Sequence, residues 1–276
     1  MLRREGVASA TLIFGLMLAA GPMRGQEPSA PPPASVVAPA PTTSTEPAPS
    51  QGRQVSWKLL APNILHDQKA IWLFPARAVQ GQHWKPTLAV VLGTAAMVAL
   101  DPHDTPYFRR TDSFSGFNKV FSGPNTAIGT AALPLAFYAV GLARRDSYTQ
   151  QTALFAGQAV VDTEILTTVL KNITARVRPV EIPLDGDYSH TWFKSQGPWF
   201  SGRGSFPSGH TSAAFSVATV LAERYNKHRW VPWVAYGLAG LVGFSRVPLQ
   251  SHFPSEVFAG AALGFAISRY VVLQHP

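Results

Sequence analysis

Residues 204–215, GSFPSGHTSAAF, place a histidine where an alanine-rich apolar segment begins. Ser208 can cap a helix that starts here, and the first backbone N–H groups of a helix attract anions. Gly209 allows a ligand close to the backbone, and His210 can transfer a proton near neutral pH. The stretch therefore predicts an anion site at a helix N-terminus. An ordinary capped helix with a surface histidine is the alternative.

A second histidine lies in SRVPLQSHFPSEVFAG, residues 245–260, just before another Pro-Ser helix start. Glu256 follows His252 by four residues, so one helical turn can bring the carboxylate to the imidazole and strengthen the ring as a nucleophile. Arg246 carries a guanidinium that suits bidentate binding of phosphate. In the alternative interpretation, Glu256 is only a first-turn acid that interacts favourably with the helix dipole.

A third stretch, KNITARVRP at 171–179, contains two cations seven residues apart, Lys171 and Arg178. This spacing predicts that both project from one face of a helix. Because proline disfavours helix at the residue before it, we expect the helix to end at Arg178. Two cations at a helix C-terminus can also be a favourable dipole interaction and nothing more. If all three stretches converge, however, they form a pocket of cations and N–H donors that suits a tetrahedral oxyanion.

Six apolar segments carry these stretches, with no persistent strand alternation, at about 86–100, 126–143, 152–171, 207–224, 230–245 and 254–273. They are rich in small residues, which let helix backbones approach closely. The predicted fold is all-α, a helical bundle of about six core helices with the active site at converging helix ends. Residues 57–85 read as short amphipathic pieces broken at Pro62 and Pro75.

The N-terminal part of the chain differs in composition. Residues 1–25 pair Arg3 and Arg4 with an apolar stretch, which predicts a secretory signal peptide or an N-terminal anchor. Residues 26–54 are rich in Pro, Ala, Ser and Thr and predict a disordered linker. The folded domain is expected over 55–276.

Composition limits the partners. The chain is 46% hydrophobic and 14% charged, with a net charge of +8 and no cysteine. The charge favours phosphate compounds or an acidic membrane surface, whereas the scattered basic residues argue against nucleic acid.

Two features of the sequence bear on localisation. Most apolar segments are shorter than the roughly 20 residues of a membrane span. The basic connections at 143–148 and 223–229 would be cytoplasmic in a spanning protein, which conflicts with an export signal. We therefore expect export to the cell envelope, with a soluble or membrane-associated periplasmic bundle favoured over an integral inner-membrane protein.

The three stretches together resemble the signature of the type-2 phosphatidic-acid phosphatase and vanadium haloperoxidase superfamily, over about residues 86–273. The matching pieces are Lys171 with Arg178-Pro179, the run Pro207-Ser208-Gly209-His210, and Ser245-Arg246 with His252 and Glu256. The resemblance implies hydrolysis of a phosphate monoester or diphosphate through a phosphohistidine intermediate. The substrate would be a lipid phosphate, an isoprenoid diphosphate or a soluble monoester.

The roles that the resemblance implies are specific. His252 would attack phosphorus, Glu256 would orient it, and His210 would protonate the leaving oxygen and then activate water. The groups expected to hold the phosphate oxygens are Lys171, Arg178, Ser208, Gly209 and Arg246. One residue departs from the signature, because Glu256 stands where the family has aspartate. We expect activity to survive this change, and Glu256→Asp to retain or raise it.

No metal or other cofactor is required by this mechanism. Vanadate would act as an inhibitor, or as the cofactor if the chain were instead a vanadate-dependent haloperoxidase. A non-catalytic or weakened anion-binding envelope protein is the other alternative.

Overall fold

The computed structural model describes residues 53–195, 197–198 and 203–274, within a compact unit that extends from Arg53 to Pro276. The signal peptide or anchor predicted at 1–25 and nearly all of the linker predicted at 26–54 lie outside these described residues, so both stay predictions.

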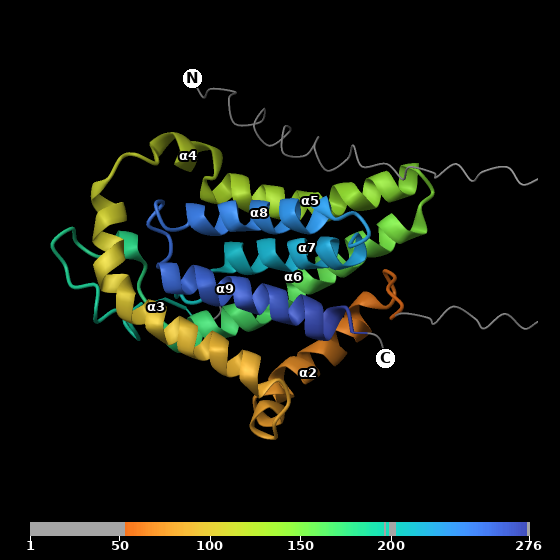
Figure 1. Ribbon diagram of the computed structural model, residues 1–276, viewed down its shortest axis with the longest axis horizontal. Coiled ribbons are helices and arrows are strands. Elements are labelled where there is room, and N and C mark those ends of the chain that lie inside the picture. Colours follow the sequence, from red (N-terminus) through yellow and green to blue (C-terminus); the bar gives the residue numbers. More distant parts are fainter. Residues whose placement is uncertain (1–52, 196, 199–202, 275–276) are drawn as a thin grey trace, which may run out of the picture. The chain divides into compact units, whose positions relative to one another are not determined.

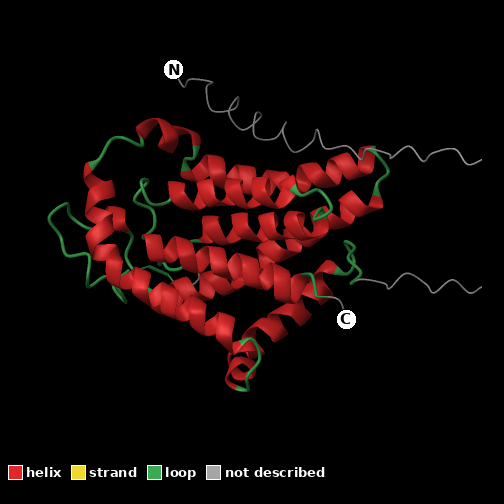
Figure 2. Cartoon of the chain, in the orientation of Figure 1, coloured by secondary structure: helices red, strands yellow, loops and turns green. Residues whose placement is uncertain are grey.

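The described part of the chain is all-helical and contains no strand (Figure 2). Figure 1 shows helices α5 to α9 running side by side, with α2 and α3 meeting in a sharp bend. Their bounds are α2 Leu60–Val79, α3 Trp84–Arg110, α4 Ser115–Val120, α5 Gly123–Ala143, α6 Ser147–Thr174, α7 Gly209–Arg224, α8 Trp230–Ser245 and α9 Pro254–Ile267. A short 3₁₀ turn covers Pro179–Glu181, and a π-helical turn, Ser268–Val272, extends α9.

The six predicted core segments correspond to α3 and to α5 through α9. The prediction for residues 57–85 was wrong, since α2 is one helix that contains both Pro62 and Pro75. Pro62 lies in the first turn, where the missing N–H has no intrahelical partner to lose. Helix α3 also extends ten residues beyond the expected end and includes Pro102 and Pro106.

Helix α7 packs against α6, α8 and α9, and small residues make this possible. A Cβ atom added at Gly260 would lie 2.6 Å from the carbonyl oxygen of Ser208, and one added at Gly264 would clash with that of Ser212. The backbones of α7 and α9 therefore touch at two successive turns, which fixes the start of α7 against the start of α9.

Among the residues that the structure describes, three helical stretches are long and apolar enough to cross a membrane: Gly123–Ala143, Ser147–Glu181 and Pro254–Val272. The bent pair α2 and α3 would be a fourth if it counted as one broken span, with its halves at 96°. Helix α5 is the most exposed of them, with 11% of its most apolar window buried. Ile128, Leu135 and Leu142 recur every seventh residue along it and are 53–65% exposed, so one face of α5 is an open apolar stripe.

Candidate active site

The predicted site residues come from four helix ends on one side of the bundle. Lys171 is in the last turn of α6, Ser208 to His210 open α7, Arg246 caps α8, and His252 precedes α9. Backbone hydrogen bonds join these ends. The Ser208 N–H donates to the Glu256 carbonyl (3.0 Å), and the His252 N–H donates to the Arg246 carbonyl (3.2 Å).

Arg178 reaches the site by a different route from the one predicted. Helix α6 ends at Thr174, because Ala175 adopts a left-handed conformation (φ 40°) and caps it. Arg178 therefore lies beyond the helix in extended backbone (φ −79°, ψ 150°). The prediction that Lys171 and Arg178 share one helical face was wrong, although both charges act on His252.

His252 and Glu256 form a buried pair. The Nδ1 atom of His252 lies 2.9 Å from Oε2 of Glu256, and the side chains are 1% and 0% exposed. Oε2 also accepts the Phe253 N–H (3.2 Å), while Oε1 accepts the Ser205 hydroxyl (2.6 Å) and lies 3.3 Å from Nη1 of Arg176. An ionised Glu256 accepts from Nδ1–H and so leaves the imidazole lone pair on Nε2, the arrangement a nucleophilic histidine needs.

Positive charge surrounds this pair. Burial lowers the pKa of His252 well below its ordinary value near 6.5, and the charges of Lys171, Arg178 and Arg246 lower it further. His252 is therefore neutral at physiological pH and has its lone pair free for attack. The same three cations are among the groups predicted to hold phosphate oxygens.

His210 is the second histidine at these helix ends, and its Nε2 atom lies 3.2 Å from the carbonyl oxygen of Gly123 at the start of α5. Because a carbonyl only accepts, Nε2 carries the proton and Nδ1 the lone pair. Burial, together with the charges of Arg246 and Lys171, lowers the pKa of His210 to about 4. A bound phosphate would offset those charges and favour the protonated ring.

The opening of α7 lies against Lys171. A Cβ atom added at Gly209 would be 3.3 Å from Nζ of Lys171 and 3.1 Å from Oε2 of Glu164. The Ser208 hydroxyl pairs with that of Thr211 (2.9 Å) and makes no side-chain cap, so the predicted N-cap bond is absent. The first amides of α7 are thus left to an anion.

Arg246 is 1% exposed and held rigidly. Its Nε and Nη2 atoms donate to the Ser245 hydroxyl at 3.0 and 2.7 Å, and Nη2 also donates to the Phe121 carbonyl. Nη1 points toward Gly123, whose added Cβ would lie 3.9 Å from it. This fixes the guanidinium between α8 and the start of α5, next to His210.

Three residues in contact with this site were missed by sequence reasoning: Ser205, Arg176 and Asp101. Ser205 bonds Glu256, and Arg176 contacts Glu256 and forms an ion pair with Asp101 (2.7 Å). Arg176 lies inside the stretch that carries Lys171 and Arg178, so its position in the sequence could have indicated that it lies near the site. Asp101 comes from α3 and had no such signal.

No group of three or more His, Asp or Glu side chains suited to a metal ion occurs in the described part of the chain. That the reaction needs no metal, and that vanadate inhibits it, stay predictions.

The chain is similar in sequence to known proteins. The PAP2 superfamily model matches residues 152–276. A lipid A 1-phosphatase of Porphyromonas gingivalis is 38% identical over 23% of this chain and 14% of its own length. Phosphatidylglycerophosphatase B of Bacillus subtilis is 34% identical over 37% of this chain and 48% of its own. The chain therefore spans less than half of these relatives.

Among solved structures, the chain is similar to a transmembrane PAP2-type phosphatidylglycerolphosphate phosphatase from Bacillus subtilis, with 24% identity and a TM-score of 0.42. The match covers 75% of this chain and 94% of that one. All eight site residues predicted from the sequence lie within the family match. The PAP2 superfamily model thus matches the part of the chain, residues 152–276, that carries the buried His252–Glu256 pair and its cations.

Proposed function

We propose that the chain is a phosphatase that releases inorganic phosphate from a phosphorylated lipid through a phosphohistidine at His252. The observation that carries the proposal is the His252–Glu256 contact of 2.9 Å beneath the charges of Lys171, Arg178 and Arg246. A neutral imidazole with a fixed tautomer, next to three cations, has the chemistry to attack a phosphate and stabilise its transition state.

In the first half-reaction, Nε2 of His252 attacks phosphorus and the bond from phosphorus to the leaving oxygen breaks. His210, protonated while phosphate is bound, gives its proton to that oxygen. Glu256 stabilises the positive ring of the phosphohistidine through Nδ1–H. The cations and the first amides of α7 hold the other phosphate oxygens.

In the second half-reaction, His210 is neutral and accepts a proton from water. The resulting hydroxide attacks phosphorus, the phosphorus–nitrogen bond breaks, and His252 is restored. Inorganic phosphate then leaves, and the proton on His210 serves the next turnover. Every proton and bond is accounted for by the two histidines and one water.

A lipid substrate is supported by two independent observations. Both relatives described above are named as phosphatases of lipids. The chain also carries the exposed apolar stripe on α5, formed by Ile128, Leu135 and Leu142. Exposure of such a stripe to water is unfavourable. We therefore place the folded unit in or on a membrane rather than free in solution.

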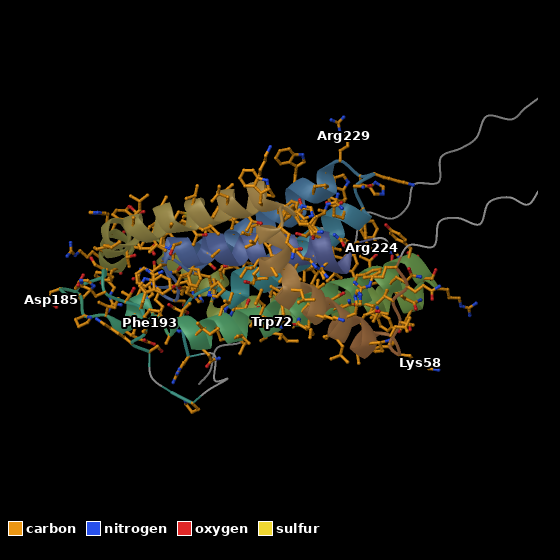
Figure 3. The ribbon with its side chains drawn as sticks, turned by 90° about the horizontal axis from the view of Figure 1, so that it is seen from below. Lys58, Trp72, Asp185, Phe193, Arg224 and Arg229 are labelled. Carbon is orange, nitrogen blue, oxygen red and sulfur yellow. The ribbon has the colours of Figure 1, made fainter. Side chains whose placement is uncertain are left out.

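The distribution of charge suggests an orientation. The two basic connections, at 143–148 and 223–229, join the helix ends away from the site, since Lys171 closes α6 and Gly209 opens α7. Asp185 and Phe193 lie in the loop that follows Arg178. Figure 3 shows both of them well separated from Arg224 and Arg229. By the positive-inside rule the basic end faces the cytoplasm, so the site would open on the outer side.

The test uses the full chain purified in detergent micelles and measures phosphate release from phosphatidic acid, phosphatidylglycerol phosphate, an isoprenoid diphosphate and a soluble aryl phosphate. We expect turnover on a lipid phosphate, loss of it in His252→Ala, and unchanged turnover in His228→Ala, which alters an exposed histidine at the opposite end. A labelled phosphoenzyme that is stable to alkali and labile to acid should form in the wild type and be absent in His252→Ala.

Each contrary result has a definite meaning. Full turnover in His252→Ala would refute the phosphohistidine. A folded wild-type chain that binds vanadate but turns over none of the four substrates would favour the non-catalytic alternative. Halide oxidation by the vanadate-loaded chain would favour the haloperoxidase.

A further inference from the structure

Each nitrogen of the Arg176 guanidinium has a polar partner. Arg176 is 1% exposed, and its Nε donates to the Thr191 hydroxyl at 3.0 Å. Nη1 donates to the Ser255 hydroxyl (3.0 Å) and lies 3.3 Å from Oε1 of Glu256, while Nη2 lies 2.7 Å from Oδ2 of Asp101. The rings of Phe253 and Trp192, centred 3.9 and 4.5 Å from Cζ, flank the guanidinium. It therefore has little freedom to move.

Asp101 holds the other side of this arrangement. It is fully buried, and its Oδ2 accepts the Ser255 hydroxyl at 2.5 Å as well as Arg176, while Oδ1 accepts the Ser255 N–H at 3.2 Å. Ser255 is in the first turn of α9, one residue before Glu256. Asp101 thus fixes both the guanidinium and the helical turn from which Glu256 projects.

The two carboxylate oxygens of Glu256 bind different partners. Oε1 meets Arg176 and Ser205, whereas Oε2 meets His252 and the Phe253 N–H. A carboxylate held at Oε1 can present Oε2 to the imidazole in one orientation only. Arg176 also keeps a positive charge beside Glu256, which favours the ionised carboxylate that accepts from Nδ1–H of His252.

The charge of Asp101 affects how strongly Arg176 binds the Glu256 carboxylate. Without it, Arg176 would bond to Glu256 alone and compete with His252 for that carboxylate. With it, one guanidinium is shared by two carboxylates, and Glu256 keeps part of its negative charge for the imidazole. Asp101 lies on α3, outside the residues that the family model matches.

We propose that Arg176 and Asp101 are positioning residues that fix the carboxylate of Glu256 and, through it, the tautomer and basicity of His252. The proposal rests on the proposed function, because it assigns these residues to the same reaction. Neither touches the substrate. A purely structural tie between α3 and α9 is the competing explanation, and it predicts lower stability without a change in how the His252–Glu256 pair titrates.

The pH dependence of turnover separates the two explanations. Charged and titratable groups face the pair from each neighbouring element: Asp101, Glu164, Lys171, Arg176, Arg178, His210 and Arg246. Arg176→Gln removes a positive charge, so the pair takes up a proton more easily and the acid limb of kcat moves to higher pH. Asp101→Asn removes a negative charge, so the acid limb moves to lower pH.

The experiment compares both variants with the wild-type full chain in micelles, on one lipid substrate. We expect kcat to fall about tenfold or more in each, with KM within about threefold, as for a misplaced catalytic group. Arg224→Gln is the matched control, since Arg224 also stacks on aromatic rings, those of Tyr148 and Phe155, but at the other end of α7. It should lower the melting temperature and leave the acid limb in place.

A second readout does not depend on turnover. Ring nitrogen NMR of His252, assigned by its absence in His252→Ala, reports the tautomer and the titration of the pair directly. We expect the Nδ1–H form in the wild type and a mixture in Arg176→Gln. If the wild type shows no turnover, the proposed function fails, while the NMR titration still decides the positioning role.

The proposal is overturned if the folded variants titrate like the wild type, or if both acid limbs move in the same direction. Should Arg176→Gln not fold, Asp101→Asn decides alone, because only a shift to lower pH agrees with the proposal.

Discussion

Nδ1 of His252 lies 2.9 Å from Oε2 of Glu256, and both side chains are sealed from solvent. The carboxylate has four polar neighbours, two at each oxygen. This contact is where the chain departs from the signature that it resembles, since glutamate stands in the place of aspartate. The contacts of Glu256 therefore determine whether the longer side chain places its carboxylate correctly against His252.

Glu256→Asp is expected to lower kcat by about 10²-fold, because shortening the side chain withdraws the carboxylate by about 1 Å from Ser205, Arg176 and His252. The sequence alone predicted retained or higher activity from the family's aspartate. That expectation is untested, and the contacts favour the opposite outcome, since Oε1 is already held at 2.6 Å by Ser205. The measurement is kcat on a lipid phosphate, with folding monitored by thermal denaturation.

Glu223→Asp is the matched control for this change. Glu223 forms an ion pair with Arg269 (3.1 Å) at the opposite end of the bundle, so its shortening should leave kcat unchanged. Equal or higher turnover in Glu256→Asp would show that the first turn of α9 shifts to restore the contact, which would contradict the fixed position argued above.

The stability of the chain should fall in acid because of His210. Its pKa is about 4 in the folded chain against 6.5 in model peptides. Below pH 6.5 the unfolded chain therefore binds a proton that the folded chain refuses until about pH 4. Stability from the neutral ring is present above pH 6.5 and is lost as the pH falls through this window, by up to about 3 kcal/mol.

Thermal denaturation in one detergent, at pH values across this window, tests the effect. The wild type should lose more of its melting temperature than His210→Gln, which has no titrating ring. Saturating inorganic phosphate should reduce the loss, since the anion favours protonated His210. Identical acid sensitivity in the wild type and the variant would contradict the lowered pKa.

Local signals were sufficient to predict where two of the site helices begin. Helix α7 starts at Gly209 and α9 at Pro254, as the two Pro-Ser stretches indicated. The end of α6 was missed, because Ala175 ends the helix in a left-handed backbone conformation, which an alanine in the sequence does not predict. Lys171 and Arg178 still act on one histidine, although the geometry that predicted this was wrong.

Long-range pairs were beyond sequence reasoning. Asp101 bonds Ser255 across 154 residues, and this contact exists only because α3 packs along α9. A buried carboxylate at the end of an apolar segment gives no indication of its partner. The pairing depends on tertiary packing, which a single sequence does not display.

Gly209→Ala should weaken the binding of orthovanadate, a tetrahedral mimic of phosphate, by about tenfold or more. The added methyl group would lie 3.3 Å from Nζ of Lys171 and 3.1 Å from Oε2 of Glu164. Both are ends of flexible side chains, so the fold tolerates the change while the ammonium group moves away from the start of α7. Titration of vanadate against residual turnover, or calorimetry, gives the dissociation constant.

Gly157→Ala provides the comparison within α6. No described atom lies within 4 Å of its added Cβ, so the substitution should stabilise the helix by up to about 1 kcal/mol and leave vanadate binding unchanged. If Gly209→Ala bound vanadate as tightly as Gly157→Ala does, Lys171 and the start of α7 would not form one anion site.

Leu135→Glu tests whether the apolar face of α5 lies in lipid. Leu135 is 65% exposed near the middle of Gly123–Ala143, and an acidic side chain at the centre of a span costs about 3 kcal/mol. We expect the variant to be lost from the membrane fraction, or to be degraded, when the full chain is expressed. Phe193→Glu, which alters a side chain 75% exposed in a loop, should fractionate like the wild type. A wild-type chain released by alkaline carbonate, together with a Leu135→Glu variant of unchanged yield and melting temperature, would instead place α5 against water and favour the soluble periplasmic bundle.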